Sequence, residues 1–125
     1  MVQVSDFIED MAEAYAWADI AICRAGAMTI FELAAAGLGA VLVPFPYAVD
    51  DHQTGNARYL VEKDAAVLIQ ETELNVESLA SAIRDIATDR GTLLRMAVAA
   101  RAQATPKATR KIAEACMELA SRGAA

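Results

Sequence analysis

The residues best able to do chemistry begin in a short segment, residues 24–29, with the sequence Arg-Ala-Gly-Ala-Met-Thr. This segment follows an apolar run at 20–23, typical of a buried strand, and leads directly into an expected helix over 27–36. Small residues around Gly26 let the backbone approach a ligand, and the unpaired N–H groups of the first helical turn carry the positive end of the helix dipole. The segment therefore predicts a phosphate or diphosphate site, with Glu32 placed to accept hydrogen bonds from nearby sugar hydroxyls.

A second polar segment, residues 50–56, leads into another expected helix and contains His52, Gln53 and Asn56. Residues four apart share one helix face, so His52 and Asn56 should lie together with Gln53 beside them. Amide side chains both donate and accept hydrogen bonds, which suits sugar hydroxyls. The neighbouring aspartates are explained as helix-capping residues, so no metal site is expected. His52 as a general base would lack a visible orienting partner.

Simpler interpretations of the same residues remain open at this stage. Gly26 could merely make a turn, because strand–glycine–helix junctions are common. Glu32 could be a solvated helix residue, and Arg24 could be the partner of a surface ion pair.

Composition narrows the class of protein. The chain has 125 residues, with 11 Lys and Arg against 17 Asp and Glu, which gives a net charge of −6. Such an acidic chain has no cationic surface for nucleic acid or anionic lipid. The uncharged stretch 33–49 is interrupted by glycines and prolines, which argues against a transmembrane span. The N-terminus lacks the pattern of a signal peptide, and Cys23 and Cys116 lack metal-ligand spacing; a reducing cytoplasmic location is expected.

The elements that must position these residues follow from hydrophobic periodicity and capping signals. The expected strands are 2–7, 20–23, 40–44 and 66–69. The expected helices are 11–18, 27–36 (ended by Gly37), 50–63 (opened by an Asp50–Gln53 capping box), 75–87, 89–102 and 105–121. Strands alternating with helices indicate an α/β fold, here a partial doubly wound parallel sheet with a helix-rich C-terminus. Gly55 inside a helix is costly, which suggests a packing or ligand reason for it.

Six ordered segments carry a resemblance to a known family: FIEDM at 7–11, AYAWAD at 14–19, CRAGAMT at 23–29, ELAAAG at 32–37, VPFP at 43–46 and DDHQTGNA at 50–57. Together they closely resemble the C-terminal part of the MurG family. These are the UDP-N-acetylglucosamine-dependent N-acetylglucosaminyltransferases of bacterial peptidoglycan synthesis. The resemblance implies an inverting glycosyltransferase of the GT-B type, whose C-terminal domain holds the donor nucleotide sugar without a cofactor.

Carried over by position, the resemblance implies a role for each matching residue. The backbone of Ile8 would meet the uracil, Glu32 would bind the ribose, and Gln53 would hold the N-acetylglucosamine hydroxyls, with His52 and Asn56 close by. The remaining residues expected to line the donor site are Arg24, Gly26, Ala27, Met28, Thr29, Ile30 and Phe31.

The resemblance also implies what is missing. Residues 1–125 would form a partial donor domain, without the N-terminal acceptor domain that meets lipid-linked MurNAc-pentapeptide, so the isolated chain should not catalyse transfer. Strand 20–23 should expose a sheet edge unless another chain, a second copy or a rearranged segment 2–7 covers it. Family members work at the cytoplasmic face of the inner membrane. The alternative is a non-catalytic subunit that binds a UDP-sugar or a partner and docks to a separate acceptor-domain chain.

Overall fold

Three parallel strands form the sheet of the computed structural model, which describes residues 1–123. Their order is β1 (Ala21–Cys23), β2 (Ala40–Leu42) and β3 (Ala66–Leu68), with β2 in the centre. Within the described residues the register aligns Ala21 with Ala40 and Ala40 with Ala66. Alanine at this row leaves room for close helix packing. The predicted α/β fold with a parallel sheet is confirmed.

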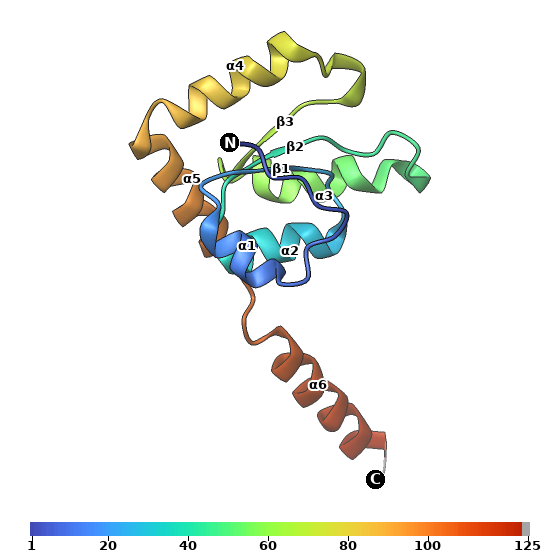
Figure 1. Ribbon diagram of the computed structural model, residues 1–125. Helices are drawn as coiled ribbons and strands as arrows, with labels where there is room; N and C mark the ends of the chain where they lie inside the picture. Colours follow the sequence, from blue (N-terminus) through green and yellow to red (C-terminus); the bar gives the residue numbers. More distant parts are fainter. Residues whose placement is uncertain (124–125) are drawn as a thin grey trace.

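Within residues 1–123, six helices occur along the chain in the order that the sequence predicts (Figure 1). They are α1 (Met11–Trp17), α2 (Ala27–Ala36), α3 (His52–Val61), α4 (Val76–Ala87), α5 (Arg90–Ala102) and α6 (Ala108–Gly123), with short 3₁₀ turns at Val49–Asp51 and Glu71–Glu73. The final helix, α6, projects away from the rest of the molecule and has no buried residue. Within residues 1–123, no helix combines the length and apolar character that crossing a membrane requires.

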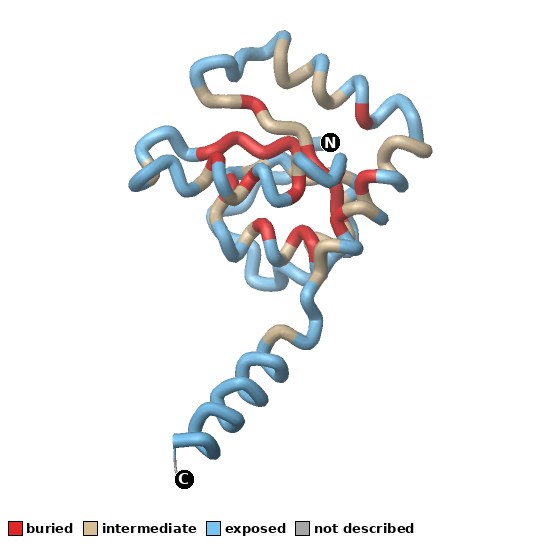
Figure 2. The backbone as a smooth tube through the Cα atoms, turned by 180° about the vertical axis from the view of Figure 1, so that it is seen from behind, coloured by how far each residue is buried: buried red, intermediate tan, exposed pale blue. Residues whose placement is uncertain are grey.

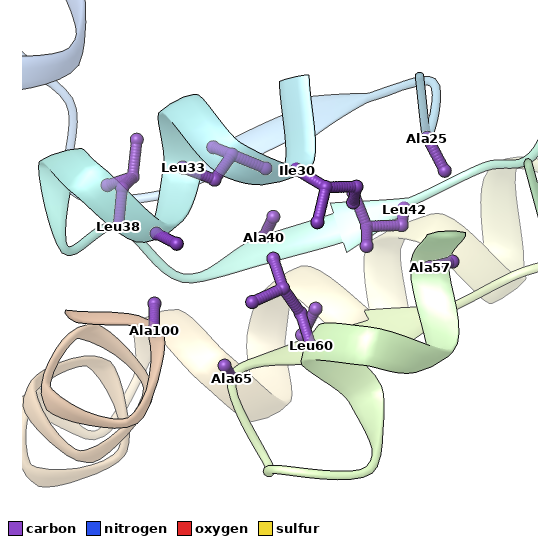
Figure 3. Packing of buried hydrophobic residues seen from close by; sticks show 12 residues of the cluster. Ala25, Ile30, Leu33, Leu38, Ala40, Leu42, Ala57, Leu60, Ala65 and Ala100 are labelled. Carbon is purple, nitrogen blue, oxygen red and sulfur yellow. The ribbon is translucent and has the colours of Figure 1, made fainter. Parts of the chain in front are cut away.

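The sheet has apolar packing on both faces because side chains alternate along the fully buried central strand β2. Ala40 and Leu42 join the larger cluster, which α2 and α3 complete with residues such as Leu33 and Leu60 (Figure 3). Val41 joins a second cluster that includes Ile86 of α4 and Met96 of α5. The buried part of the backbone accordingly centres on β2 and the inner sides of its helices (Figure 2). This two-sided packing fixes where the ends of the strands, and hence the loops after them, lie.

Local signals set several helix ends. Gly37 adopts the left-handed conformation, with φ of 66°, and ends α2 as predicted. Asn75 and Ser78 form a reciprocal capping box at the start of α4, and Asp89 accepts a hydrogen bond from the Gly91 N–H at the start of α5.

The predicted strand at 2–7 is wrong. Residues 1–10 form no strand and are all exposed. A strand exists only if its backbone groups pair with a neighbour, and alternation of apolar and polar residues cannot supply that neighbour. Among the described residues, β1 pairs only with β2.

β1 is therefore an edge strand, as predicted. Its middle residue, Ile22, is 47% exposed, so the expectation that this run forms a buried strand is wrong. The run is apolar because its flanking residues, Ala21 and Cys23, pack against the larger core cluster. An unpaired edge with an apolar side chain is a surface that another strand could join.

The capping box predicted from Asp50 and Gln53 is also wrong. Both Asp50 and Asp51 have positive φ, and Asp51 is the N-cap residue of α3 without a side-chain bond to a backbone N–H. The Asp51 carboxylate instead accepts a hydrogen bond from the Thr54 hydroxyl at 2.7 Å. This leaves the Gln53 side chain free for another task. The last helix likewise begins at Ala108, later than the start at residue 105 that the sequence predicts.

Replacing Gly55 by alanine should stabilise the protein. A Cβ at Gly55 would meet no atom within 4 Å, so within the described residues packing gives no reason for glycine at this exposed position of α3. Because alanine is the better helix former, we expect Gly55→Ala to raise the free energy of unfolding by about 0.5–1 kcal/mol. Thermal or urea unfolding would measure it. A destabilised variant would show that this stretch of α3 is not an ordinary exposed helix.

Candidate functional site

The turn before α2 is open to solvent. Gly26 is the N-cap residue in an extended conformation (φ −62°, ψ 148°) and provides no side-chain cap. Its carbonyl accepts the first helical hydrogen bond, from the Ile30 N–H at 3.0 Å. The N–H groups of Ala27, Met28 and Thr29 precede that bond and have no intrahelical acceptor. The sequence analysis predicts a phosphate or diphosphate at these N–H groups, and that assignment stays a prediction.

The structure of the described residues gives no conformational or packing reason for glycine at position 26. Its φ is negative, and a Cβ there would meet only the Thr29 hydroxyl oxygen, at 3.7 Å. Neither backbone strain nor packing within residues 1–123 therefore requires glycine. Close approach of a ligand would be a reason for glycine at this position.

The start of α3 holds this turn in place. Oε1 of Gln53 accepts hydrogen bonds from the Ala25 N–H at 3.1 Å and the Phe45 N–H at 2.9 Å. Nδ2 of Asn56 donates to the Ala25 carbonyl at 3.0 Å. Two side chains of α3 thus satisfy both backbone groups of Ala25, which is fully buried. The loops after β1 and β2 and the first turn of α3 form one hydrogen-bonded unit.

The same side chains keep groups available for a ligand. Nε2 of Gln53, Oδ1 of Asn56 and the ring of His52 have no hydrogen-bond partner among residues 1–123, and His52 is exposed. The structure therefore brings Gln53 and Asn56 to the predicted turn, and their bonds to its backbone were not foreseen. Their predicted contacts with a sugar stay a prediction.

Arg24 makes the ion pair that the sequence left open. Its Nη2 lies 2.5 Å from Oε1 of Glu71, and its Nη1 donates to the carbonyls of Val43 and Pro44 at 3.4 and 3.3 Å. The guanidinium also lies 5.6 Å from the centre of the Phe45 ring. Because both charged side chains are more than a third exposed, the pair contributes little to stability. Its effect is to connect the loop after β1 to the segment after β3.

Glu32 has a partner that the sequence analysis missed. The Tyr15 hydroxyl of α1 donates to Oε2 of Glu32 in α2 at 2.8 Å. Burial, followed by the hydrogen bond to Glu32, raises the pKa of Tyr15 to about 12, so the phenol stays protonated. Tyr15 also packs against the core, which is the role that helical spacing predicts for it. No spacing rule could have shown that its hydroxyl meets a residue 17 positions away on another helix.

Three of the predicted site residues lie outside the turn formed by residues 24–29. Ile8 is half-exposed in the N-terminal segment and lines a surface hollow formed by that segment. The side chain of Ile30 is buried in the core and its N–H is already bonded to Gly26, whereas Phe31 is 52% exposed beside the ring of Tyr59. Within residues 1–123, no group of three or more His, Cys, Asp or Glu side chains could hold a metal.

Comparison with known proteins decides the family. Residues 1–116 match the model of the glycosyltransferase family 28 C-terminal domain. The chain belongs to this family. The predicted glycosyltransferase family is confirmed, as is the predicted fold, a partial parallel α/β sheet from the C-terminal domain of such an enzyme.

Individual relatives agree with the family. The transferase from Marinobacter nauticus, named UDP-N-acetylglucosamine–N-acetylmuramyl-(pentapeptide) pyrophosphoryl-undecaprenol N-acetylglucosamine transferase, is 55% identical over 94% of this chain and 32% of its own length. A transferase of the same name from Azoarcus sp. is 59% identical over 91% of this chain and 32% of its own. The crystal structure of Acinetobacter baumannii MurG superimposes with a TM-score of 0.88 at 46% identity, covering 94% of this chain and 35% of that one. The chain spans about a third of the length of these relatives.

Proposed function

We propose that this family 28 domain binds the donor, UDP-N-acetylglucosamine, for transfer of N-acetylglucosamine to lipid-linked MurNAc-pentapeptide. The observation that carries the proposal is the uncapped N-terminus of α2, next to Nε2 of Gln53, which has no hydrogen-bond partner among residues 1–123. A phosphate-binding helix end with sugar-binding groups beside it matches the chemistry of a nucleotide sugar.

The diphosphate would lie on the N–H groups of Ala27, Met28 and Thr29, where the missing side chain of Gly26 leaves room. During transfer, bond cleavage at the anomeric carbon puts negative charge on the leaving UDP. N–H groups fixed at a helix end stabilise that charge without having to reorient. The loops that carry them are held by the Gln53 and Asn56 side chains, which supports such pre-organisation.

The sugars would be held by side chains around this turn. Nε2 of Gln53 is a free donor for an N-acetylglucosamine hydroxyl, with His52 and the Asn56 carbonyl nearby. Glu32, one turn into α2, would accept hydrogen bonds from the ribose, and the backbone of Ile8 would meet the uracil edge.

The acceptor would be met by the part of the longer relatives that this chain does not span. Residues 1–125 are then a partial donor domain that does not catalyse transfer alone, and the complete enzyme works at the cytoplasmic face of the membrane. In the alternative arrangement, a separate chain supplies the acceptor domain.

Calorimetric titration with UDP-N-acetylglucosamine, UDP-glucose and UDP tests this proposal. We expect all three to bind, with the N-acetyl sugar tightest. Glu32→Gln should weaken UDP binding about tenfold, because a charge-assisted hydrogen bond contributes about 1.5–3 kcal/mol. Glu62→Gln, at an exposed site after α3, should leave the affinity unchanged. Absence of binding by the folded wild-type chain would refute the proposed function.

A further inference from the structure

The hydrogen bond between Tyr15 and Glu32 joins α1 to α2, and both residues line a surface cavity of about 450 Å³. Apart from this pair, the cavity is lined by Met11 and four alanines, so Tyr15 and Glu32 bring its polar side-chain groups. A carboxylate whose orientation is fixed before a ligand arrives loses less conformational freedom on binding. The phenol is the one protein donor to Glu32 among residues 1–123.

We propose that Tyr15 is a positioning residue for Glu32: its hydroxyl holds Oε2, so that Oε1 is presented to the ribose hydroxyls of the bound nucleotide. This inference rests on the proposed function, because it assigns the means by which one part of the donor is recognised. Tyr15 itself need not touch the ligand.

Three features of the pair fit this role. Glutamate on a helix surface samples several side-chain rotamers, and a bond from a neighbouring helix removes part of that freedom before the ligand arrives. The Tyr15 ring is itself held against the core cluster, so the donor is fixed in space. With its pKa raised to about 12, the hydroxyl remains a donor throughout the neutral range.

The test is a comparison of UDP with 2′,3′-dideoxy-UDP, which lacks the hydroxyls that Glu32 would bind. The wild-type chain should bind UDP about tenfold more tightly, from the hydrogen bonds to a charged acceptor. Tyr15→Phe removes only the phenolic oxygen. We expect it to weaken UDP binding about three- to tenfold and to leave binding of the dideoxy analogue unchanged.

The matched control is Tyr59→Phe, which removes a hydroxyl that donates to the Gln103 carbonyl at 3.2 Å and should change neither affinity. Thermal unfolding of both variants would report any general loss of structure. Equal weakening toward both ligands would assign Tyr15 a structural role and overturn the inference, as would an unchanged preference for UDP. If the wild-type chain bound neither ligand, the proposed function itself would be refuted. If the wild-type preference for UDP over the dideoxy analogue survived in Tyr15→Phe, only the inference would be refuted.

Discussion

Gln53→Ala should lower the free energy of unfolding by about 2 kcal/mol, because the Ala25 and Phe45 N–H groups then lose their shared acceptor. Ala25 is fully buried, so no water readily replaces the lost bond. The loop after β1 should also loosen, and with it the turn that begins α2. We therefore expect binding of UDP-N-acetylglucosamine to fall at least tenfold, more than the loss of one sugar contact would cause.

A second substitution separates the two roles of this side chain. Gln53→Glu keeps oxygen acceptors for both N–H groups but removes the Nε2 donor. Its stability should match that of the wild type in urea unfolding, while its affinity for the nucleotide sugar falls. Gln70→Ala is the control, since it removes a single hydrogen bond to Thr54 and should leave the affinity unchanged. Full stability in Gln53→Ala would show that the bridge between the loops is not needed.

How far the sequence predicts this fold depends on whether a signal is local. Gly37 ends α2, and Asn75 with Ser78 opens α4, because a C-terminal glycine and an N-terminal amide act within one turn of the chain. The strands β2 and β3 were predictable for a related reason. Each lies in a continuous apolar run of four or five residues, too short for an ordinary helix, and that length favours a buried strand.

Features that depend on distant neighbours could not be predicted in this way. The run at 2–7 has the alternation of a strand but no neighbour to pair with. Gln53 has the spacing of a capping residue, yet its side chain satisfies the backbone of two other loops. Tertiary contacts decided both the absence of a strand at 2–7 and the role of the Gln53 side chain. Such contacts depend on which segments meet in the folded protein.

The candidate site shows the same division. The turn between β1 and α2 was predictable, since a strand, a glycine and a helix follow one another in the chain. The contacts that hold it were not, because Tyr15 meets Glu32 and Arg24 meets Glu71 across separate elements. Of the residues expected to touch a ligand, Glu32 is held by a hydrogen bond from another helix. Gln53 and Asn56 instead hold the backbone of the neighbouring loop.

Gly26→Asp should leave the protein as stable as the wild type or stabilise it, and yet weaken donor binding at least about 100-fold. An aspartate at the N-cap can accept hydrogen bonds from the first N–H groups of α2 and interacts favourably with the helix dipole, gaining a few tenths to about 1 kcal/mol. The backbone angles of residue 26 suit any amino acid, and a Cβ there meets no close contact. The new side chain would therefore fold into the place proposed for the diphosphate.

The expected loss of binding follows from charge. A carboxylate about 4 Å from a phosphate costs about 4 kcal/mol per pair of charges at an effective dielectric constant near 20, so affinity should fall at least about 100-fold. Gly26→Asn caps the helix without the charge and should lose only about tenfold. Titration with UDP-N-acetylglucosamine at low and high salt would separate the two, because screening should recover part of the affinity only in the aspartate variant. If Gly26→Asp binds the nucleotide sugar like the wild type, the diphosphate does not lie at the start of α2.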